Sequence, residues 1–305
     1  MKKSKVLFSV IIPQRDSLKT LPRLIESIPE REDIEIVIVD NSPTPINKTD
    51  IKTSRFFNLF HSDSCRFAGG ARNVGIENSS GEWLIFADSD DFFENNAFTI
   101  LDEFVDSEYD LIYFGCNSVY DDTLMPSDRH LMFQGIVDNY LSGKENEMKT
   151  RLYHVVPWAK MVRRSLVDEY NIRFDEVIAA NDMYFSTQVA YYAKAFHVDA
   201  RPIYVVTTRK GSLTNRWNYD ILKSRYVVGL RRNQFLKQRG LSKYQVSVMV
   251  YLQKALKMSV STFFEFIGLS IKYRQNIFVG VSNWLKTKKR IDRSDKTKSK
   301  YIVKG

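Results

Sequence analysis

Hydrophobic and polar residues follow two alternating patterns over the first 115 residues of the chain. Helical spacing, with apolar residues every three or four positions, runs from Leu18 to Ile28, and Pro22 suits the first turn of that helix. The same spacing returns over 71–78 and 96–105. Further apolar runs have the length of buried strands: 6–12, 34–39, 55–61, 82–87 and 111–115. Strands that alternate with helices predict an α/β fold with an open, doubly wound and mostly parallel sheet.

The pattern becomes less regular over 116–219. Apolar runs predict strands at 153–161 and 202–208, and helical spacing predicts a helix at 182–193. We therefore expect a second region here, distinct in organisation from residues 1–115.

Helical spacing dominates the third region, 220–305. One apolar stripe runs from Val248 to Ile271, and a second runs from Ile277 to Leu285. The segment 286–304 is dense in charge and poor in apolar residues, which predicts disorder at this end.

The composition is that of a globular protein, with 44% hydrophobic and 27% charged residues. No apolar run reaches the roughly 20 residues that a membrane-spanning helix needs. The net charge of +9 is unevenly divided. Residues 1–219 hold 25 Lys and Arg against 32 Asp and Glu, a net charge of −7, whereas 220–305 hold 20 against 4, a net charge of +16. A mildly acidic body therefore carries a strongly basic tail.

The cysteines and the first residues bear on location. Cys65 and Cys116 form neither a disulfide framework nor a zinc site, which is typical of a reducing cytoplasm. The apolar run 6–12 follows two lysines, as in a signal peptide, but it ends at Pro13 without a small-residue cleavage site. We therefore expect a cytoplasmic protein.

An acidic cluster follows the expected strand at 82–87. Asp88, Asp90 and Asp91 stand within four residues, where their charges repel one another. Oxygen-only ligands suit Mg²⁺ or Mn²⁺, which bridge carboxylates to phosphates. The alternative is a solvated turn that caps the following helix. In doubly wound sheets ligands bind beyond the carboxyl ends of strands, which favours a functional role.

Four segments in order carry a resemblance to a known family: 9–13, 38–42, 70–76 and 81–91, which read SVIIP, IVDNS, GARNVGI and GEWLIFADSDD. This series resembles the family-2 glycosyltransferases, which have the GT-A fold, over residues 6 to about 215. The resemblance implies that 1–115 is the nucleotide-sugar-binding half of a GT-A domain and 116–219 its acceptor-binding half. The helical region 220–305 lies outside it.

The resemblance also implies roles for individual residues on the donor side. Asp40 and Asn41 would hold the nucleotide base, Asn41 standing where many members carry a second Asp. Asp88, Asp90 and Asp91 would hold Mn²⁺ or Mg²⁺. The remaining donor-binding candidates are Pro13, Arg15, Arg72, Asn73, Asp88, Ser89, Arg209 and Ser212. Gln14-Arg15-Asp16 departs from the family's aromatic-Asn pair. The alternative for Arg72 is a helix-surface side chain, and for Asn73 a helix-packing one.

On the acceptor side, Trp158 and Lys160 match a Trp-x-Lys segment of many bacterial members. The family's catalytic base commonly lies in a Glu-Asp pair at a helix start, and here the pair is Asn181-Asp182. The resemblance therefore implies Asp182 as the base, with Asn181 on the acceptor side. The alternative is local, because Asn and Asp are common helix caps.

The resemblance implies an inverting, metal-dependent enzyme that moves a sugar from a nucleotide-sugar donor, a UDP-sugar, to a hydroxyl of a glycan or lipid-linked acceptor in cell-surface polysaccharide synthesis. One alternative is a sugar-phosphate nucleotidyltransferase, although the loop after the first strand lacks the glycines such enzymes use. Another is a non-catalytic basic protein on an inactive GT-A scaffold, binding membrane or nucleic acid.

The basic tail has two interpretations of its own. Basic residues beside amphipathic stripes favour peripheral contact of 220–305 with the anionic inner face of a membrane. The alternative is a packed helix pair with a solvated basic face. We expect no nucleic-acid partner, because the tail has no zinc ligands and no recognisable binding motif.

Overall fold

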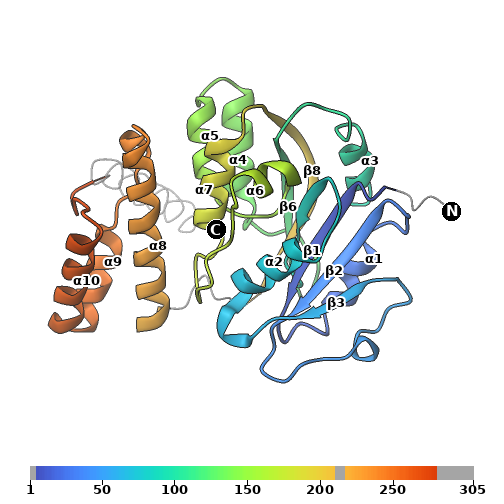
Figure 1. The fold of residues 1–305 in the computed structure, drawn as a ribbon, viewed down its shortest axis with the longest axis horizontal. Coiled ribbons are helices and arrows are strands. Elements are labelled where there is room, and N and C mark those ends of the chain that lie inside the picture. The colour runs from blue at the N-terminus through green and yellow to red at the C-terminus, as the bar shows by residue number, and fades with distance from the viewer. Residues whose placement is uncertain (1–4, 210–216, 280–305) are drawn as a thin grey trace, which may run out of the picture. The chain divides into compact units, whose positions relative to one another are not determined.

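The computed structural model describes residues 5–209 and 217–279 (Figure 1). It divides the chain into two compact units, residues 1–216 and 217–305. The expected division of the first unit at 115/116 falls inside a strand, β6 (Leu111–Tyr120).

One mixed, mostly parallel sheet organises the first unit, in the strand order β3-β2-β1-β4-β7-β6-β8-β5. β1, β2, β3 and β4 pair in parallel, as do β6 and β8, whereas β7 is antiparallel to both its neighbours and β5 to β8. The doubly wound α/β prediction is therefore confirmed. The strands are β1 (Phe8–Gln14), β2 (Ile34–Asp40), β3 (Asn58–His61), β4 (Trp83–Phe86), β5 (Phe92–Phe93), β6, β7 (Lys160–Arg163) and β8 (Phe196–Thr208).

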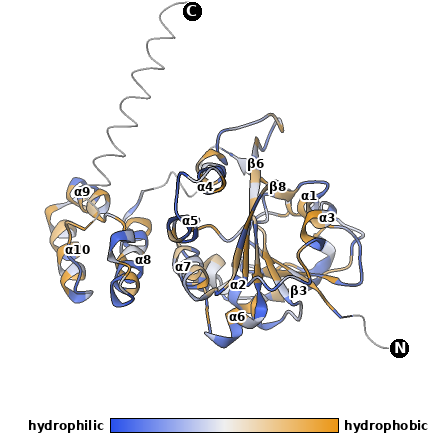
Figure 2. Ribbon diagram, turned by 90° about the horizontal axis from the view of Figure 1, so that it is seen from above, coloured by the Kyte–Doolittle hydropathy of each residue, from blue (hydrophilic) through white to orange (hydrophobic). Residues whose placement is uncertain are grey.

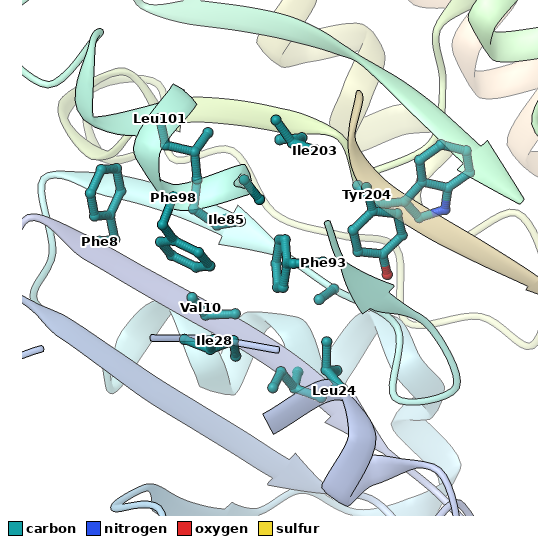
Figure 3. Close-up of a cluster of buried hydrophobic side chains, with 14 of the residues drawn as sticks. Phe8, Val10, Leu24, Ile28, Ile85, Phe93, Phe98, Leu101, Ile203 and Tyr204 are labelled. Atoms are coloured by element: carbon teal, nitrogen blue, oxygen red, sulfur yellow. The ribbon is translucent and has the colours of Figure 1, made fainter. Parts of the chain in front are cut away.

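Helices cover both faces of this sheet because its strands are apolar on both sides. Figure 2 shows the central strands as mainly hydrophobic. One buried cluster joins the sheet to α1 and α3 (Figure 3), and a second joins it to α2, α6 and α7. The helices are α1 (Leu21–Glu26), α2 (Phe67–Glu77), α3 (Ala97–Asp102), α4 (Leu131–Leu141), α5 (Glu147–Tyr153), α6 (Arg164–Glu169) and α7 (Met183–Tyr192), with short 3₁₀ turns at Lys48–Asp50 and Ser64–Arg66.

The strand expected over 153–161 is wrong in most of its length. Helix α5 extends to Tyr153, and strand β7 begins only at Lys160. Two backbone features interrupt the apolar run between them. Pro157 has no N–H to donate to a sheet, and Ala159 has a positive φ of 54°. The strand expected over 202–208 is correct but longer, because β8 starts at 196 and continues past a register shift against β6.

The second unit is helical: α8 (Tyr219–Gln238), a 3₁₀ turn (Ser242–Tyr244), α9 (Met249–Met258) and α10 (Val260–Lys272). The stripe expected from Val248 to Ile271 is divided at Ser259, whose extended backbone separates α9 from α10. The Ser259 hydroxyl accepts a hydrogen bond from the Thr262 N–H at 3.0 Å, capping α10.

The core of this unit is apolar and comprises Leu222, Tyr226, Leu230, Val248, Leu252, Ala255 and Phe266. Most of the expected second stripe and the whole of 286–304 lie outside the described residues. Among the helices of 5–209 and 217–279, none has the length and hydropathy to cross a membrane.

Candidate functional site

The carboxyl ends of β1, β2 and β4 meet at one edge of the sheet, because these strands are parallel neighbours. Gln14 ends β1 and Asp40 ends β2, and the two residues are register partners. The acidic loop 88–91 follows β4 at the same edge. The edge therefore gathers the sequence candidates where such sheets bind their ligands.

Side chains from other elements fix the backbone of the acidic loop. The Tyr204 hydroxyl accepts a hydrogen bond from the Asp88 N–H at 2.8 Å. The Asp90 carbonyl accepts from Arg23 Nη2 at 2.7 Å and from Thr207 Oγ1 at 2.9 Å. Nothing in the sequence singled out Arg23, Tyr204 or Thr207, because each lies far along the chain from the loop that it holds.

The three carboxyl groups of the loop have different surroundings. Asp91 is 3% exposed, and its Oδ1 accepts the Thr207 N–H at 2.7 Å. Burial, followed by the neighbouring carboxylates, holds the pKa of Asp91 well above its ordinary value. The side chains of Asp88 and Asp90 are 32% and 23% exposed. The predicted metal-ligand role of Asp91 therefore lacks geometric support, and Asp88 and Asp90 are the open carboxylates.

Arg72 joins the acidic loop to the start of α7. Its Nη2 donates to Asp88 Oδ1 at 2.5 Å, and its Nη1 donates to Asn181 Oδ1 at 2.9 Å. The guanidinium lies over the Phe174 ring, 5.3 Å from its centroid. Arg72 is only 5% exposed, so the alternative of a helix-surface arginine is wrong.

Asp182 stands at the N-terminus of α7 but makes no side-chain cap to that helix. The capping explanation for its presence therefore does not apply. Burial raises the pKa of Asp182, Arg72 opposes this shift, and Asp88 adds to it. The structure thus brings Asp182 within the electrostatic reach of both Arg72 and Asp88. A carboxyl with a raised pKa is suited to proton transfer near neutral pH.

Asn73 has the packing role that was the alternative for it. Its Oδ1 accepts the Phe174 N–H at 2.8 Å, and its Nδ2 donates to the Phe174 carbonyl at 3.0 Å. Gly69, one turn earlier on α2, lies against the backbone of Asp175. A Cβ added at Gly69 would lie only 1.9 Å from the Asp175 carbonyl oxygen, so a larger residue does not fit there. These contacts seat α2 against residues 174–175 and place Arg72.

A cleft of about 340 Å³ opens beside the ends of β1 and β2. Gln14 and Ser42 line it, together with Asp16, Leu18, Lys19, Thr44 and Ile46. Gln14 is fully buried; its Oε1 accepts the Ser17 N–H at 3.0 Å, while its Nε2 has no hydrogen-bond partner among the described residues. The sequence did not mark Gln14 as a site residue.

Asp40 shapes the wall of this cleft. It is 1% exposed, and its carboxyl oxygens accept the N–H groups of Ser42 at 3.2 Å and Ile46 at 3.0 Å. His61 Nδ1 lies 3.5 Å from Asp40 Oδ2. In this structure the carboxylate holds the loop after β2, while its role toward a nucleotide base stays a prediction. Asn41 beside it is also buried.

Arg209 lies at the acidic loop, with Nη2 3.2 Å from Asp90 Oδ2 and its side chain 49% exposed. Pro13 and Ser89 are buried, whereas Arg15 is exposed and donates to the Ser64 carbonyl. Ser212 lies outside the described residues.

Trp158 and Lys160 lie in the interior, 5% and 3% exposed. Trp158 stacks on Tyr204, the residue that holds Asp88, with ring centroids 5.6 Å apart. Lys160 Nζ donates to the His154 carbonyl at 2.6 Å, and burial lowers the pKa of Lys160 to about 7. Both side chains support the site from within, so direct contact with an acceptor is not what the structure shows for them. Asn181 reaches the site through Arg72.

The open carboxylates fit a divalent cation only with help from a ligand. Within 5–209 and 217–279, no group of three or more His, Cys, Asp or Glu side chains is arranged to hold a metal ion. Mg²⁺ is commonly held by one or two carboxylates, with substrate phosphates and water completing its shell. Asp88 and Asp90 match that requirement as a pair.

Comparison with known proteins gives relatives of one kind. EpsH of Bacillus subtilis, a putative glycosyltransferase, is 25% identical over 232 residues, which cover 72% of this chain and 66% of EpsH. TarS of Staphylococcus aureus, a poly(ribitol-phosphate) beta-N-acetylglucosaminyltransferase, is 23% identical over 222 residues, which cover 67% of this chain and 36% of TarS. WfaP of Escherichia coli is 31% identical over 121 residues, 37% of this chain and 46% of WfaP. The chain thus matches about two thirds of EpsH and about a third of TarS.

Solved structures agree in fold. The crystal structure of S. aureus TarS 1–349 in complex with UDP-GlcNAc superposes with a TM-score of 0.60 at 20% identity, covering 87% of this chain and 81% of that one. The corresponding complex with UDP gives a TM-score of 0.56. These confirm the predicted GT-A fold. The profile of glycosyl transferase family 2 matches residues 9–170, more than half of the chain, and the chain belongs to that family.

Proposed function

We propose that the protein transfers a sugar from a UDP-sugar to a hydroxyl of a glycan or lipid-linked acceptor, with inversion at the anomeric carbon, during cell-surface polysaccharide synthesis. Family membership supports the class of reaction. The names of relatives support the donor and acceptor: TarS is named as acting on poly(ribitol-phosphate), and WfaP as using UDP-Glc and a diphosphoundecaprenol-linked acceptor. The observation that carries the proposal is Arg72, which ties the open carboxylate of Asp88 to the start of α7, where Asp182 stands.

In this proposal Asp182 is the general base. Its carboxylate takes the proton of the acceptor hydroxyl as that oxygen forms a bond to the anomeric carbon. The bond from that carbon to the diphosphate breaks on the opposite face, so configuration inverts. The raised pKa of Asp182 brings the base closer to the pH at which it works. Positioning the two reactants in line supplies much of the rate.

The acidic loop and the arginines serve the donor. Asp88 and Asp90 would hold a Mn²⁺ or Mg²⁺ ion, which when bound neutralises the charge that develops on a departing diphosphate. Arg209, half exposed beside Asp90, presents the forked donor geometry that suits phosphate oxygens. The nucleotide base occupies the cleft beside Gln14, whose unpartnered amide nitrogen can donate a hydrogen bond to a base carbonyl.

Two variants separate donor binding from transfer. Asp90→Ala is expected to abolish the rise in melting temperature that a UDP-sugar gives with Mn²⁺, because the cation loses a ligand. Asp182→Asn is expected to keep that rise and to stop transfer, since the amide cannot take a proton. Asp122→Asn, an exposed aspartate, is the control and leaves both unchanged. A normal transfer rate in Asp182→Asn contradicts the base assignment, and pyrophosphate release in place of UDP release contradicts the reaction class.

A further inference from the structure

Helix α10 carries apolar side chains on its outward face. Val260, Phe264 and Ile271 are 62%, 65% and 72% exposed. Their spacing of four and seven residues places them on one side of the helix. We call these three side chains the α10 apolar face.

The opposite side of the same helix is the buried one. Phe266 and Ser270 are 0% and 1% exposed, and the Tyr226 hydroxyl donates to the Phe266 carbonyl at 3.1 Å. Packing within this unit therefore explains the apolar residues on the buried side of α10 but not those on its exposed side. An apolar stripe on a helix normally faces an apolar environment, while the polar side chains of the helix face water. We therefore expect the α10 apolar face to contact an apolar environment other than the core of the second unit.

Basic residues flank helix α10 at both ends. Lys257 precedes the helix, and Lys272 and Arg274 stand at its end; all three are exposed and have no ion-pair partner among the described residues. The acidic residue of α10, Glu265, is already neutralised by Lys223 at 2.8 Å. Residues 217–279 hold 11 Lys and Arg against two Asp and Glu, and 280–305 hold nine against two.

Charge decides which occupant fits. A second copy of this unit would bring another net charge of +9 against the first, from residues 217–279 alone. Nucleic acid would neutralise the positive charge but offers no apolar partner to the aliphatic side chains of Val260 and Ile271. An anionic lipid surface fits both the positive charge and the apolar side chains. Its headgroups would contact the lysines, and its acyl chains would contact the α10 apolar face.

We propose that the α10 apolar face inserts into an anionic membrane surface, with the helix lying in the interface and the basic residues around it on the headgroups. The attachment that we propose is peripheral, because the α10 apolar face covers only one side of a helix of 13 residues. The proposal rests on the second unit alone and does not depend on the proposed reaction.

Vesicle binding of the full-length chain tests it. Phosphatidylcholine vesicles with added phosphatidylglycerol are expected to sediment the protein, and pure phosphatidylcholine vesicles to bind it far more weakly. The double variant Phe264→Ser/Ile271→Ser is expected to lose about tenfold or more in partitioning, because two apolar side chains leave the acyl region. Lys272→Gln is expected to lose about fivefold on the anionic vesicles only.

The matched control is the double variant Phe56→Ser/Leu131→Ser, which removes exposed apolar side chains from the first unit, 77% and 55% exposed. It is expected to bind vesicles as the unmodified chain does, and all variants are expected to keep their melting temperature and donor hydrolysis. Wild-type vesicle binding by Phe264→Ser/Ile271→Ser overturns the proposal. So does equal binding to neutral vesicles, a dimer in light scattering that this variant dissolves, or binding to single-stranded DNA that this variant loses.

Discussion

The central position of Arg72 makes its replacement by Met the most informative single change in the chain. Met keeps the hydrophobic stem and helix propensity of the arginine but removes the guanidinium. Three contacts are lost: the bonds to Asp88 and Asn181 and the contact with the Phe174 ring. The variant therefore disconnects the acidic loop from the start of α7 while leaving the sheet intact.

The cost in stability follows from these contacts. A hydrogen bond between charged groups contributes about 1.5 to 3 kcal/mol, and the bond to Asp88 falls at the low end because that carboxylate is one-third exposed and can be hydrated. The bond to Asn181 adds about 1 to 1.5 kcal/mol. We expect the free energy of unfolding to fall by about 3 kcal/mol, measured by urea denaturation.

The pH dependence distinguishes a catalytic setting from a merely structural one. Arg72 opposes the burial that raises the pKa of Asp182. Its removal therefore raises that pKa further, so that at a given pH less of the base is deprotonated. The acidic limb of kcat/KM for sugar transfer is expected to move to higher pH in Arg72→Met, while the basic limb keeps its position.

Arg201→Met is the matched control. Arg201 also pairs with two carboxylates, Glu103 and Asp199, but it is half exposed and does not contribute to the pKa of Asp182. It is expected to lose little stability and to keep the wild-type pH profile. If Arg72→Met lowers stability yet leaves the acidic limb where it was, Asp182 is not the base that Arg72 tunes.

Three further changes test individual contacts. Asp91→Asn keeps an acceptor for the Thr207 N–H and removes a buried carboxyl group. Because the pKa of Asp91 is raised in the native state, this group costs stability as the pH rises, so the variant should keep or increase its melting temperature at neutral pH. Mn²⁺-dependent donor binding should persist. Tyr204→Phe leaves the Asp88 N–H without its partner and should cost about 1 to 3 kcal/mol in urea denaturation. Burial lowers the pKa of Lys160 to about 7, so the native state loses this proton above about pH 7, whereas the unfolded state keeps it up to about pH 10.5. The free energy of unfolding should therefore rise between about pH 7 and about pH 10.5. Lys160→Met should flatten this rise. Loss of Mn²⁺-dependent binding in Asp91→Asn, full stability in Tyr204→Phe, or an unchanged slope in Lys160→Met would each contradict the corresponding reasoning.

Periodicity was sufficient for most of the first unit because buried parallel strands are continuous apolar runs and their helices are amphipathic. It failed at 153–161, where an apolar run that resembles a strand is a helix end and a turn. Hydrophobicity alone does not distinguish these, whereas Pro157 within the run was a local signal against a strand. The break at Ser259 is marked in the sequence only by a residue that commonly caps helices.

The site was predictable where it consists of consecutive residues at a strand end. Asp88, Asp90 and Asp182 could be proposed because motif and position agree; the structure shows where they lie, and their roles stay predictions. The groups that hold them were not, because Arg23, Tyr204 and Thr207 reach the acidic loop across the sheet from distant segments. Asp91 differs from Asp88 and Asp90 in its burial, which depends on packing and is not visible in a segment that holds three aspartates.

The acidic body and the basic tail separate the charge of the chain into two regions, with a net charge of −7 over 1–219 and of +16 over 220–305. Around the site, Asp90, Asp91 and Asp182 all have raised pKa values, although Arg72 and Arg209 lie beside them. Burial is the largest cause of all three shifts, so these carboxyl groups lie where water stabilises their charge poorly. Such a site gains most from a ligand that brings its own cation, as a metal-bound diphosphate does. The surplus of lysine and arginine stands instead in residues 217–305, and an anionic lipid surface is the partner that we propose for this charge and for the α10 apolar face.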